Sequence, residues 1–231
     1  MNVYRNERMI ARNALIGKVS MLAGLVVLGG GMFISFRYPE QFNLSLLALL
    51  FGFILSQLGI YYSNRWGRRP RPDELLDGAL KGMDKKYSLY HYSSPVNHLL
   101  IGPAGMWALF PYYQRGTIVY DKNRYKQRGG NLYLKIFAQE GLGRPELDVA
   151  AAKDSLQAFL KKRFPDEEFP PADALLVFTN PEVNLAIADD AEPPAPAVKL
   201  KDLKELIRKS AKSKPVSLEK IKLLEEALRP E

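Results

Sequence analysis

Cysteine is absent from the 231 residues, so disulfide bonds and thiolate metal sites are excluded. Histidine is scarce: His91 and His98 are the only two, too few for a histidine-rich metal centre. Acidic residues are rare at the start, because residues 1–72 hold two of them against nine lysines and arginines, whereas residues 73–231 hold 23 against 24. The net charge of +8 therefore comes almost entirely from the first segment. The nearly neutral remainder argues against strong nucleic-acid binding.

Charge is missing altogether from two long apolar runs. Residues 19–36 form an uncharged run of 18, and residues 41–64 form a second run of 24. At a rise of about 1.5 Å per residue, the shorter run covers about 27 Å as a helix, close to the hydrocarbon thickness of a bilayer. Aromatic side chains, which gather at membrane–water boundaries, stand at the end of the second run: Tyr61, Tyr62 and Trp66. The pattern predicts a transmembrane helical hairpin.

Two other interpretations of these runs remain open. Basic residues before the first run also suit a cleaved signal peptide, although no small-x-small cleavage site follows that run at a suitable distance and a second, longer apolar run comes soon after. A buried hairpin of a globular protein would need a polar stripe, which neither run has. Within a membrane, the Gly29–Gly31 run would let the two helices approach closely.

Basic residues at the ends of the runs predict the orientation. Four precede the first run and four follow the second, whereas the short loop carries Arg37 beside Glu40. Because cytoplasmic flanks are rich in lysine and arginine, both termini are predicted to be cytoplasmic. We expect a two-span protein of a bacterial-type inner (plasma) membrane. The basic run at 67–72 could in addition attract anionic lipid head groups.

The pattern becomes that of a soluble domain after Pro72. Amphipathic spacing predicts helices over 73–87 and 144–164, and two more C-terminal helices over Lys199–Ser213 and Ser217–Leu228. Short apolar segments predict strands at 87–92, 98–101, 106–110, 117–121, 132–137, 174–179 and 183–187, with a polar segment and a Gly-Gly turn at 122–131. This order favours an α/β or α+β domain. The C-terminal helices would pack on that domain or on a partner.

One stretch of this domain is similar to a known family. The residues "NHLLIGPAGMWAL", followed by "QRGTI" and preceded by an acidic helix and "YSLYHY", resemble the nuclease-related domain (NERD) family. The family phrase reads Asp-His, aliphatics, Gly-Pro-x-Gly, an apolar strand, acid-x-Lys, a turn and Gly-x-Ile. The resemblance covers roughly residues 73–187 and implies a restriction-endonuclease-like α/β (α+β) fold.

The resemblance also implies a magnesium site between carboxylates and a lysine that positions the attacking water. The aspartate of the family falls on Asn97, its strand-end acid on Phe110 and its lysine on Tyr112, and the helix acid remains at Asp73 or Glu74. Phenylalanine is no metal ligand, and tyrosine is a poor substitute for an ammonium group. We therefore expect a degenerate site without catalytic residues, bound metal or cofactor.

The alternative is a nuclease, weak or active, whose acidic ligands are displaced. Asp121 and Glu140 are the nearest acids in the sequence, and magnesium would be the cofactor only in this case. Pro111 is a second obstacle to the family site, because proline removes a backbone donor from the strand that presents it.

A cluster of cations follows the family motif: Arg115, Lys122, Arg124, Lys126, Arg128 and Lys135. Tyrosines are interleaved with them, at positions 112, 113, 120, 125 and 133. The composition suits a surface that binds phosphates and stacks on bases, a surface against anionic lipid, or a solvated hairpin without a ligand. His98 is expected to be a hydrogen-bonded packing residue rather than a catalytic base.

The sequence thus predicts six segments: a basic cytoplasmic N-terminus (1–18), two membrane helices (19–64), a basic linker (65–72), a NERD-like domain (73–188), a proline-rich linker (189–198) and a C-terminal helical pair (199–231). The predicted role is binding or scaffolding at the cytoplasmic membrane face, without catalysis. The expected partners are the bilayer, anionic lipid head groups or an unidentified protein, with weak or no nucleic-acid binding.

Overall fold

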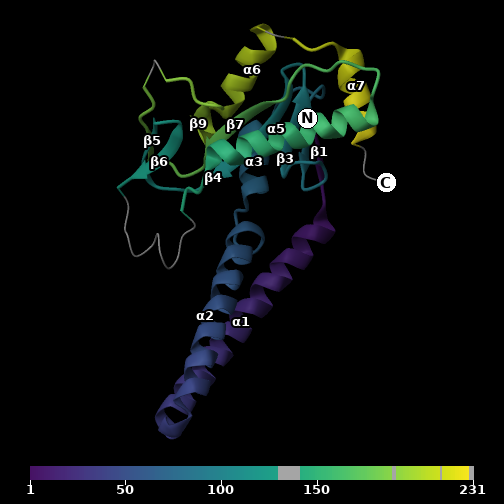
Figure 1. Ribbon diagram of the computed structural model, residues 1–231. Helices are drawn as coiled ribbons and strands as arrows, with labels where there is room; N and C mark the ends of the chain where they lie inside the picture. The colour runs from purple at the N-terminus through teal and green to yellow at the C-terminus, as the bar shows by residue number, and fades with distance from the viewer. Residues whose placement is uncertain (130–140, 189–190, 214, 229–231) are drawn as a thin grey trace. The chain divides into compact units, whose positions relative to one another are not determined.

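The computed structural model describes residues 1–129, 141–188, 191–213 and 215–228 of the chain. It divides into two compact units (Figure 1). Residues 7–71 form a helix pair, whereas residues 1–6 and 72–231 form an α/β domain. The domain therefore takes its first segment from before the helix pair and the remainder from after it.

Two long helices make up the helix pair, as the apolar runs predicted. The elements are α1 (Glu7–Arg37), η1 (Pro39–Gln41), α2 (Phe42–Tyr62) and the π-helical turn η2 (Ser63–Gly67). Both long helices have the length and apolar composition needed to cross a membrane. Helix α1 starts well before residue 19, so most of the segment predicted as a basic N-terminus is helical.

Small residues line the contact between α1 and α2. They recur every seventh residue on each helix and are buried, and we call them the glycine seam: Gly17, Gly24 and Gly31 of α1, with Ser45, Gly52 and Gly59 of α2. A Cβ atom added to Gly24 would lie 2.6 Å from Ser56 Oγ. No atom lies within 4 Å of such a Cβ at Gly29 or Gly30, so the Gly29–Gly31 run contributes only its last member to the seam.

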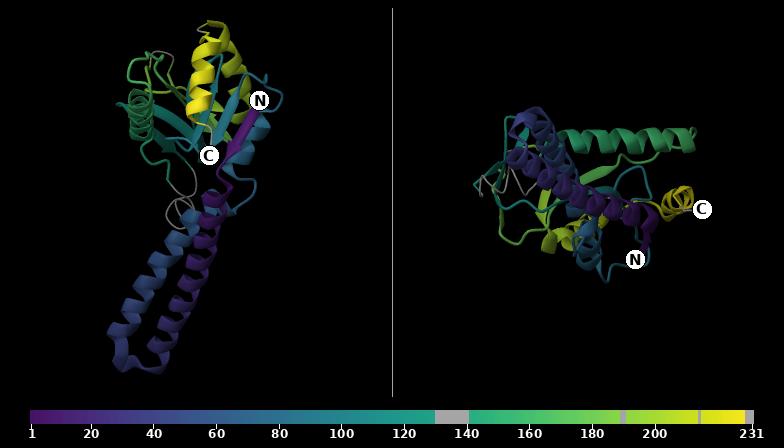
Figure 2. Two further views of the ribbon diagram at one scale, coloured as in Figure 1. Left: turned by 90° about the vertical axis from the view of Figure 1, so that its right-hand side faces the viewer. Right: turned by 90° about the horizontal axis from the view of Figure 1, so that it is seen from below.

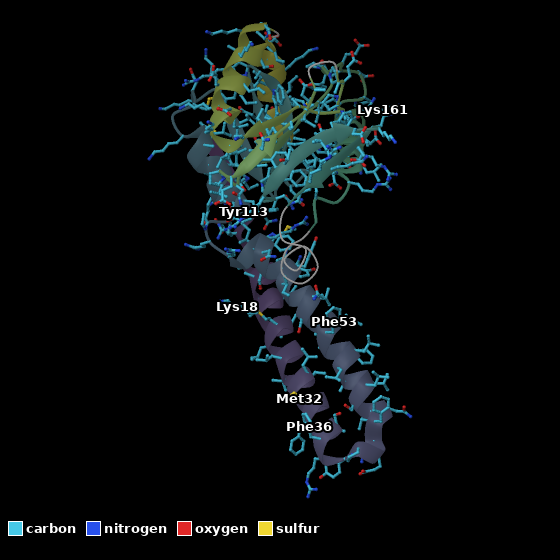
Figure 3. All side chains as sticks on the ribbon, turned by 90° about the vertical axis from the view of Figure 1, so that its left-hand side faces the viewer. Lys18, Met32, Phe36, Phe53, Tyr113 and Lys161 are labelled. Atoms are coloured by element: carbon cyan, nitrogen blue, oxygen red, sulfur yellow. The ribbon has the colours of Figure 1, made fainter. Side chains whose placement is uncertain are left out.

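Large apolar side chains cover the outside of the helix pair. Leu25 is 67% exposed and Phe36 is 80% exposed. Figure 3 shows Met32, Phe36 and Phe53 on the outside of the two ribbons, and all three are exposed. The pair is therefore inverted relative to a hairpin of a soluble protein, because small residues face inward and large apolar residues face outward.

A mixed sheet of six strands forms the centre of the α/β domain, in the order β1-β2-β3-β4-β7-β9. The strands are β1 (Asn2–Arg5), β2 (Ser88–His91), β3 (His98–Gly102), β4 (Gly105–Tyr112), β7 (Asp173–Phe178) and β9 (Ala197–Lys199). The pairs β1–β2, β4–β7 and β7–β9 are parallel, and β2–β3–β4 is antiparallel. The four inner strands were predicted. The two edge strands were not, since they begin in segments taken as the N-terminus and the proline-rich linker.

A second, smaller sheet has the order β6-β5-β8. Its strands are β5 (Gly116–Asp121), β6 (Arg124–Arg128) and β8 (Val183–Leu185). Lys122 and Asn123, both with positive φ, make the two-residue turn between β5 and β6. The segment predicted as polar, with a Gly-Gly turn, at 122–131 thus contains this turn and the strand β6. The strand predicted at 132–137 lies outside the described residues.

Helices cover both faces of the six-stranded sheet (Figures 1 and 2). They are α3 (Pro72–Leu80) and α6 (Leu203–Ser213, after the turn η3 at Leu200–Asp202) on one face, and α5 (Pro145–Arg163) and α7 (Leu218–Ala227) on the other. Along β7, Leu175 and Val177 face α3 and α6, whereas Leu176 and Phe178 face α5 and α7. Both C-terminal helices therefore pack on their own domain, one on each face.

Candidate functional site

The β4 strand carries the two positions that the resemblance equates with acid and lysine. Phe110 and Tyr112 are half-buried and pack against the apolar core on the α5 face of the sheet. The Tyr112 ring stacks on Phe178 with centroids 5.6 Å apart, and its hydroxyl donates to Asp148 Oδ2 at 3.2 Å. Both side chains are thus parts of an apolar and aromatic layer at the end of β4.

The other family positions lie elsewhere. Asp73 is fully buried at the start of α3, the helix that covers the opposite face of the sheet, and Glu74 beside it is half-buried. Asn97 is exposed in the bend between β2 and β3, where its carbonyl accepts a hydrogen bond from the Tyr92 nitrogen at 2.7 Å. The structure therefore does not bring the family positions of β4 together with the α3 acid.

Asp73 instead belongs to a buried polar network that links four elements. Its Oδ2 lies 2.9 Å from Arg5 Nε of β1, and Arg5 also donates to Asp77 Oδ2. Asp77 Oδ1 lies 3.1 Å from His91 Nε2 of β2, and His91 Nδ1 lies 2.8 Å from His98 Nδ1 of β3. We call these five residues the Arg5 network.

The Arg5 network is closed to solvent at its centre. Asp73 and His91 have no exposed surface, and His98 is 4% exposed. The sequence prediction that His98 is a hydrogen-bonded packing residue is confirmed. Within the described ranges, no group of three or more His, Asp or Glu side chains is placed to hold a metal ion. The network therefore ties β1 to α3, β2 and β3, and buried charges are tolerated because they are paired.

Sequence reasoning missed Arg5. Its role depends on β1, a four-residue strand that pairs with β2 in the register Arg5↔His91. Four residues give too short a pattern to predict a strand, and the partner strand lies far along the chain. The single available signal was the position of a basic residue shortly before the first apolar helix. That position was already explained by the positive charge expected beside a membrane helix.

The β5–β6 hairpin carries the predicted cation cluster. Arg124, Lys126 and Arg128 alternate along β6 and point to one face, opposite Asp121, Val119 and Thr117 of β5. Lys126 Nζ lies 2.7 Å from Asp121 Oδ2, and this hydrogen bond, aided by the neighbouring cations, lowers the pKa of the Asp121 carboxyl.

The remaining predicted cations are dispersed. Arg115 forms an exposed ion pair with Glu182 at 3.7 Å, and Lys122 occupies the turn between the strands. Lys135 lies outside the described residues. The cluster is therefore a face of three cations, one of which is already neutralised by an aspartate.

The tyrosines of the hairpin lie on its other face. Tyr120 and Tyr125 are cross-strand partners with ring centroids 4.9 Å apart. Tyr125 is buried, and its hydroxyl donates to the carbonyl of Ala195. Burial raises the pKa of this phenol. Because these rings and the β6 cations are on opposite faces, the two groups do not form one surface for stacking on bases and binding phosphates.

Comparison of the chain with protein-family models, with curated proteins and with solved structures finds no match.

Proposed function

We propose that this protein is anchored in the inner membrane by the helix pair and that its α/β domain serves a binding or scaffolding role at the cytoplasmic face. The inverted helix pair carries this proposal. Apolar side chains gain nothing from packing together in lipid, so membrane helices associate through small residues that let their backbones approach. The glycine seam has this composition, and the exposed leucines, valines and phenylalanines match a hydrocarbon solvent.

The pairing of β1 with β2 supports a two-span topology. Asn2–Arg5 and Ser88–His91 lie side by side in one sheet, yet they flank the helix pair in the sequence. Both flanks must therefore lie on the same side of any membrane that the pair crosses, which requires an even number of spans. The excess of arginine and lysine at the two flanks favours the cytoplasm as that side.

The residues at the family positions support a non-catalytic role. Phe110 and Tyr112 stand where the resemblance implies an acid and a lysine, and Asp73 is engaged by Arg5. A domain that only binds a partner would keep the fold of the family without the acid and the lysine of its catalytic site. The NERD relationship itself is part of this proposal.

Single-cysteine labelling tests the topology with little background, because the natural chain has no cysteine. Glu40→Cys places one thiol in the loop between the helices, and Lys161→Cys places one on the exposed face of α5. In right-side-out vesicles, a membrane-impermeant maleimide should label only the first variant. In inverted vesicles it should label only the second. Labelling of Lys161→Cys in right-side-out vesicles, or release of the protein by alkaline carbonate, would overturn the proposal.

A calorimetric titration of magnesium and manganese into the full-length protein, with a DNA and RNA cleavage assay on the same sample, tests the non-catalytic role. We expect neither saturable metal binding nor cleavage. Metal-dependent cleavage that is lost in Asp148→Asn or Asp121→Asn would instead establish the nuclease alternative, with ligands displaced from the family positions.

A further inference from the structure

A pocket of about 420 Å³ lies in the α/β domain, and no residue of the Arg5 network or of the cation face of β6 is among those that line it. Its wall is formed by the end of β7 and the residues that follow it, by the end of β9 with η3, and by Ala79 of α3. The volume is within the range of pockets that bind small molecules.

The pocket follows from the topology of the sheet. Strands β7 and β9 are parallel neighbours, and their last residues, Phe178 and Lys199, are direct partners. After Phe178 the chain turns toward β4, where the Thr179 nitrogen donates to the Tyr112 carbonyl at 2.8 Å. After Lys199 it enters η3 and α6. The two segments that follow β7 and β9 therefore diverge beyond the carboxyl ends of these parallel strands and leave a crevice between them. Open α/β sheets bind ligands in crevices of this kind.

The rim of the pocket is held in place by hydrogen bonds. Asn180 is buried, and its side-chain oxygen accepts from the Glu182 nitrogen at 2.9 Å. The Thr179 hydroxyl donates to the Tyr112 carbonyl at 3.2 Å. These polar groups are thus used to fix the loop, and the wall also carries two lysines, Lys199 and Lys201.

The chemistry of the wall combines apolar surface with positive charge. Ala79, Pro181 and Leu200 supply apolar surface, and Lys199 and Lys201 are the two basic residues of the wall. No acidic side chain is among the residues that line the pocket. Among the hydrogen bonds and ion pairs of the described residues, none involves the side-chain ammonium group of Lys199 or Lys201. Two uncompensated cations beside an apolar wall favour a ligand with an anionic head and an apolar body.

We propose that this pocket is a binding site for a small organic anion with an apolar body, such as an aromatic or branched aliphatic carboxylate. Lys199 and Lys201 bind the anionic group, and Ala79, Pro181 and Leu200 contact the body. The site goes beyond the proposed membrane role and does not depend on it, because every residue that lines it belongs to the α/β domain.

Three probes separate the contributions of charge and apolar surface. 4-Fluorobenzoate has both features, 4-fluorobenzamide keeps the body without the charge, and inorganic phosphate keeps the charge without the body. Each is titrated into the full-length protein in nanodiscs of zwitterionic lipid. The two fluorinated probes are followed by 19F NMR, and phosphate is followed by calorimetry. We expect saturable binding of 4-fluorobenzoate, and binding of the other two that is at least about tenfold weaker.

Matched variants assign the binding to the pocket. Lys199→Ala/Lys201→Ala should weaken binding of 4-fluorobenzoate by at least about tenfold. Ala79→Met, which fills the pocket without changing charge, should weaken it as well. Lys161→Ala/Lys162→Ala removes the same charge from the exposed end of α5 and should leave binding unchanged. Circular dichroism verifies that each variant is folded.

Three outcomes would overturn the proposal: no saturable binding of 4-fluorobenzoate, equal weakening in the Lys161/Lys162 control, or phosphate bound as tightly as the aromatic acid. None of these outcomes depends on the cysteine-labelling experiment. A result against the ligand site is therefore distinguished from a result against the membrane topology.

Discussion

The Nδ1 atoms of His91 and His98 lie 2.8 Å apart between the neighbouring strands β2 and β3. So short a contact requires one ring to donate and the other to accept. The Asp77 carboxylate, 3.1 Å from His91 Nε2, acts as an acceptor and places the proton of His91 on that nitrogen. His91 Nδ1 is then the acceptor, and the His98 ring donates from its own Nδ1.

We predict that the His91 and His98 rings adopt different tautomers. Long-range 15N NMR correlations of the histidine rings should show His91 protonated at Nε2 and His98 protonated at Nδ1 in neutral solution. Asp77→Ala should abolish the preference of His91, because it removes the acceptor at Nε2. Spectra with both rings protonated at Nε2 would contradict the arrangement.

We predict that Asp73→Asn destabilises the α/β domain. The change leaves Arg5 facing a neutral group in a buried position, which should lower the free energy of unfolding by about 1–3 kcal/mol. Amide hydrogen exchange should rise first in β1, because Arg5 is the residue that connects this strand to α3. Asp154→Asn removes the same charge from the exposed surface of α5 and should have no measurable effect. Equal losses in both variants would contradict the role of Arg5.

We predict that two glycine substitutions on the same helix have opposite effects. Gly24→Ala places its Cβ 2.8 Å from the Ser56 backbone nitrogen, so the helices must separate, at a cost of about 1–3 kcal/mol. Gly30→Ala meets no atom within 4 Å and gains up to about 1 kcal/mol of helix propensity. Thermal unfolding of the full-length protein in detergent should therefore show a lower transition for the first variant alone. A similar decrease in both would argue against the seam.

We predict that Tyr125 makes the stability of the domain decrease in alkali. Burial raises the pKa of Tyr125 in the folded state, whereas an unfolded tyrosine ionises near pH 10. Above about pH 10, Tyr125 ionises in the unfolded chain but stays protonated in the folded domain, so the unfolded state alone is stabilised by ionisation. The free energy of unfolding therefore decreases as the pH rises, by up to about 1.4 kcal/mol per pH unit.

Tyr125→Phe provides the measurement. At pH 8 the variant should be less stable by about 1 kcal/mol, because it lacks the hydrogen bond to the Ala195 carbonyl. Between pH 10 and about 11.5 the difference should shrink and then reverse in urea unfolding. A difference that is independent of pH would show that Tyr125 ionises normally in the folded domain.

Local patterns predicted the elements whose residues are long apolar or amphipathic runs. The two apolar helices, the inner strands and the helices α3 and α5 are examples, because burial imposes a period that a single segment displays. Strands β1 and β9 were missed for the opposite reason. Asn2–Arg5 and Ala197–Lys199 are short edge strands, and only their pairing with β2 and β7 makes them strands.

The candidate sites were less accessible from the sequence. The position of Arg5 beside Asp73 depends on β1, and the lysines of the pocket are brought together with Phe178 by the pairing of β7 and β9. The glycine seam was visible as a spacing of seven residues, but the consecutive Gly29–Gly31 run drew the prediction to residues of which only Gly31 faces the partner helix. The separation of the β6 cations from Tyr120 and Tyr125 followed from the register of the hairpin.

The pairing of β1 with β2 also determines the order of events during synthesis. Tyr4 stacks on Tyr90 with centroids 4.9 Å apart, so the residues of β1, which leave the ribosome before α1, wait for a partner that emerges only after both long helices. Until then the segment before α1 has no sheet to join, and the sheet lacks its first edge strand. The domain can therefore be completed only after the helical hairpin has been synthesised. A chain that lacks the residues before α1 has a sheet without its first edge strand.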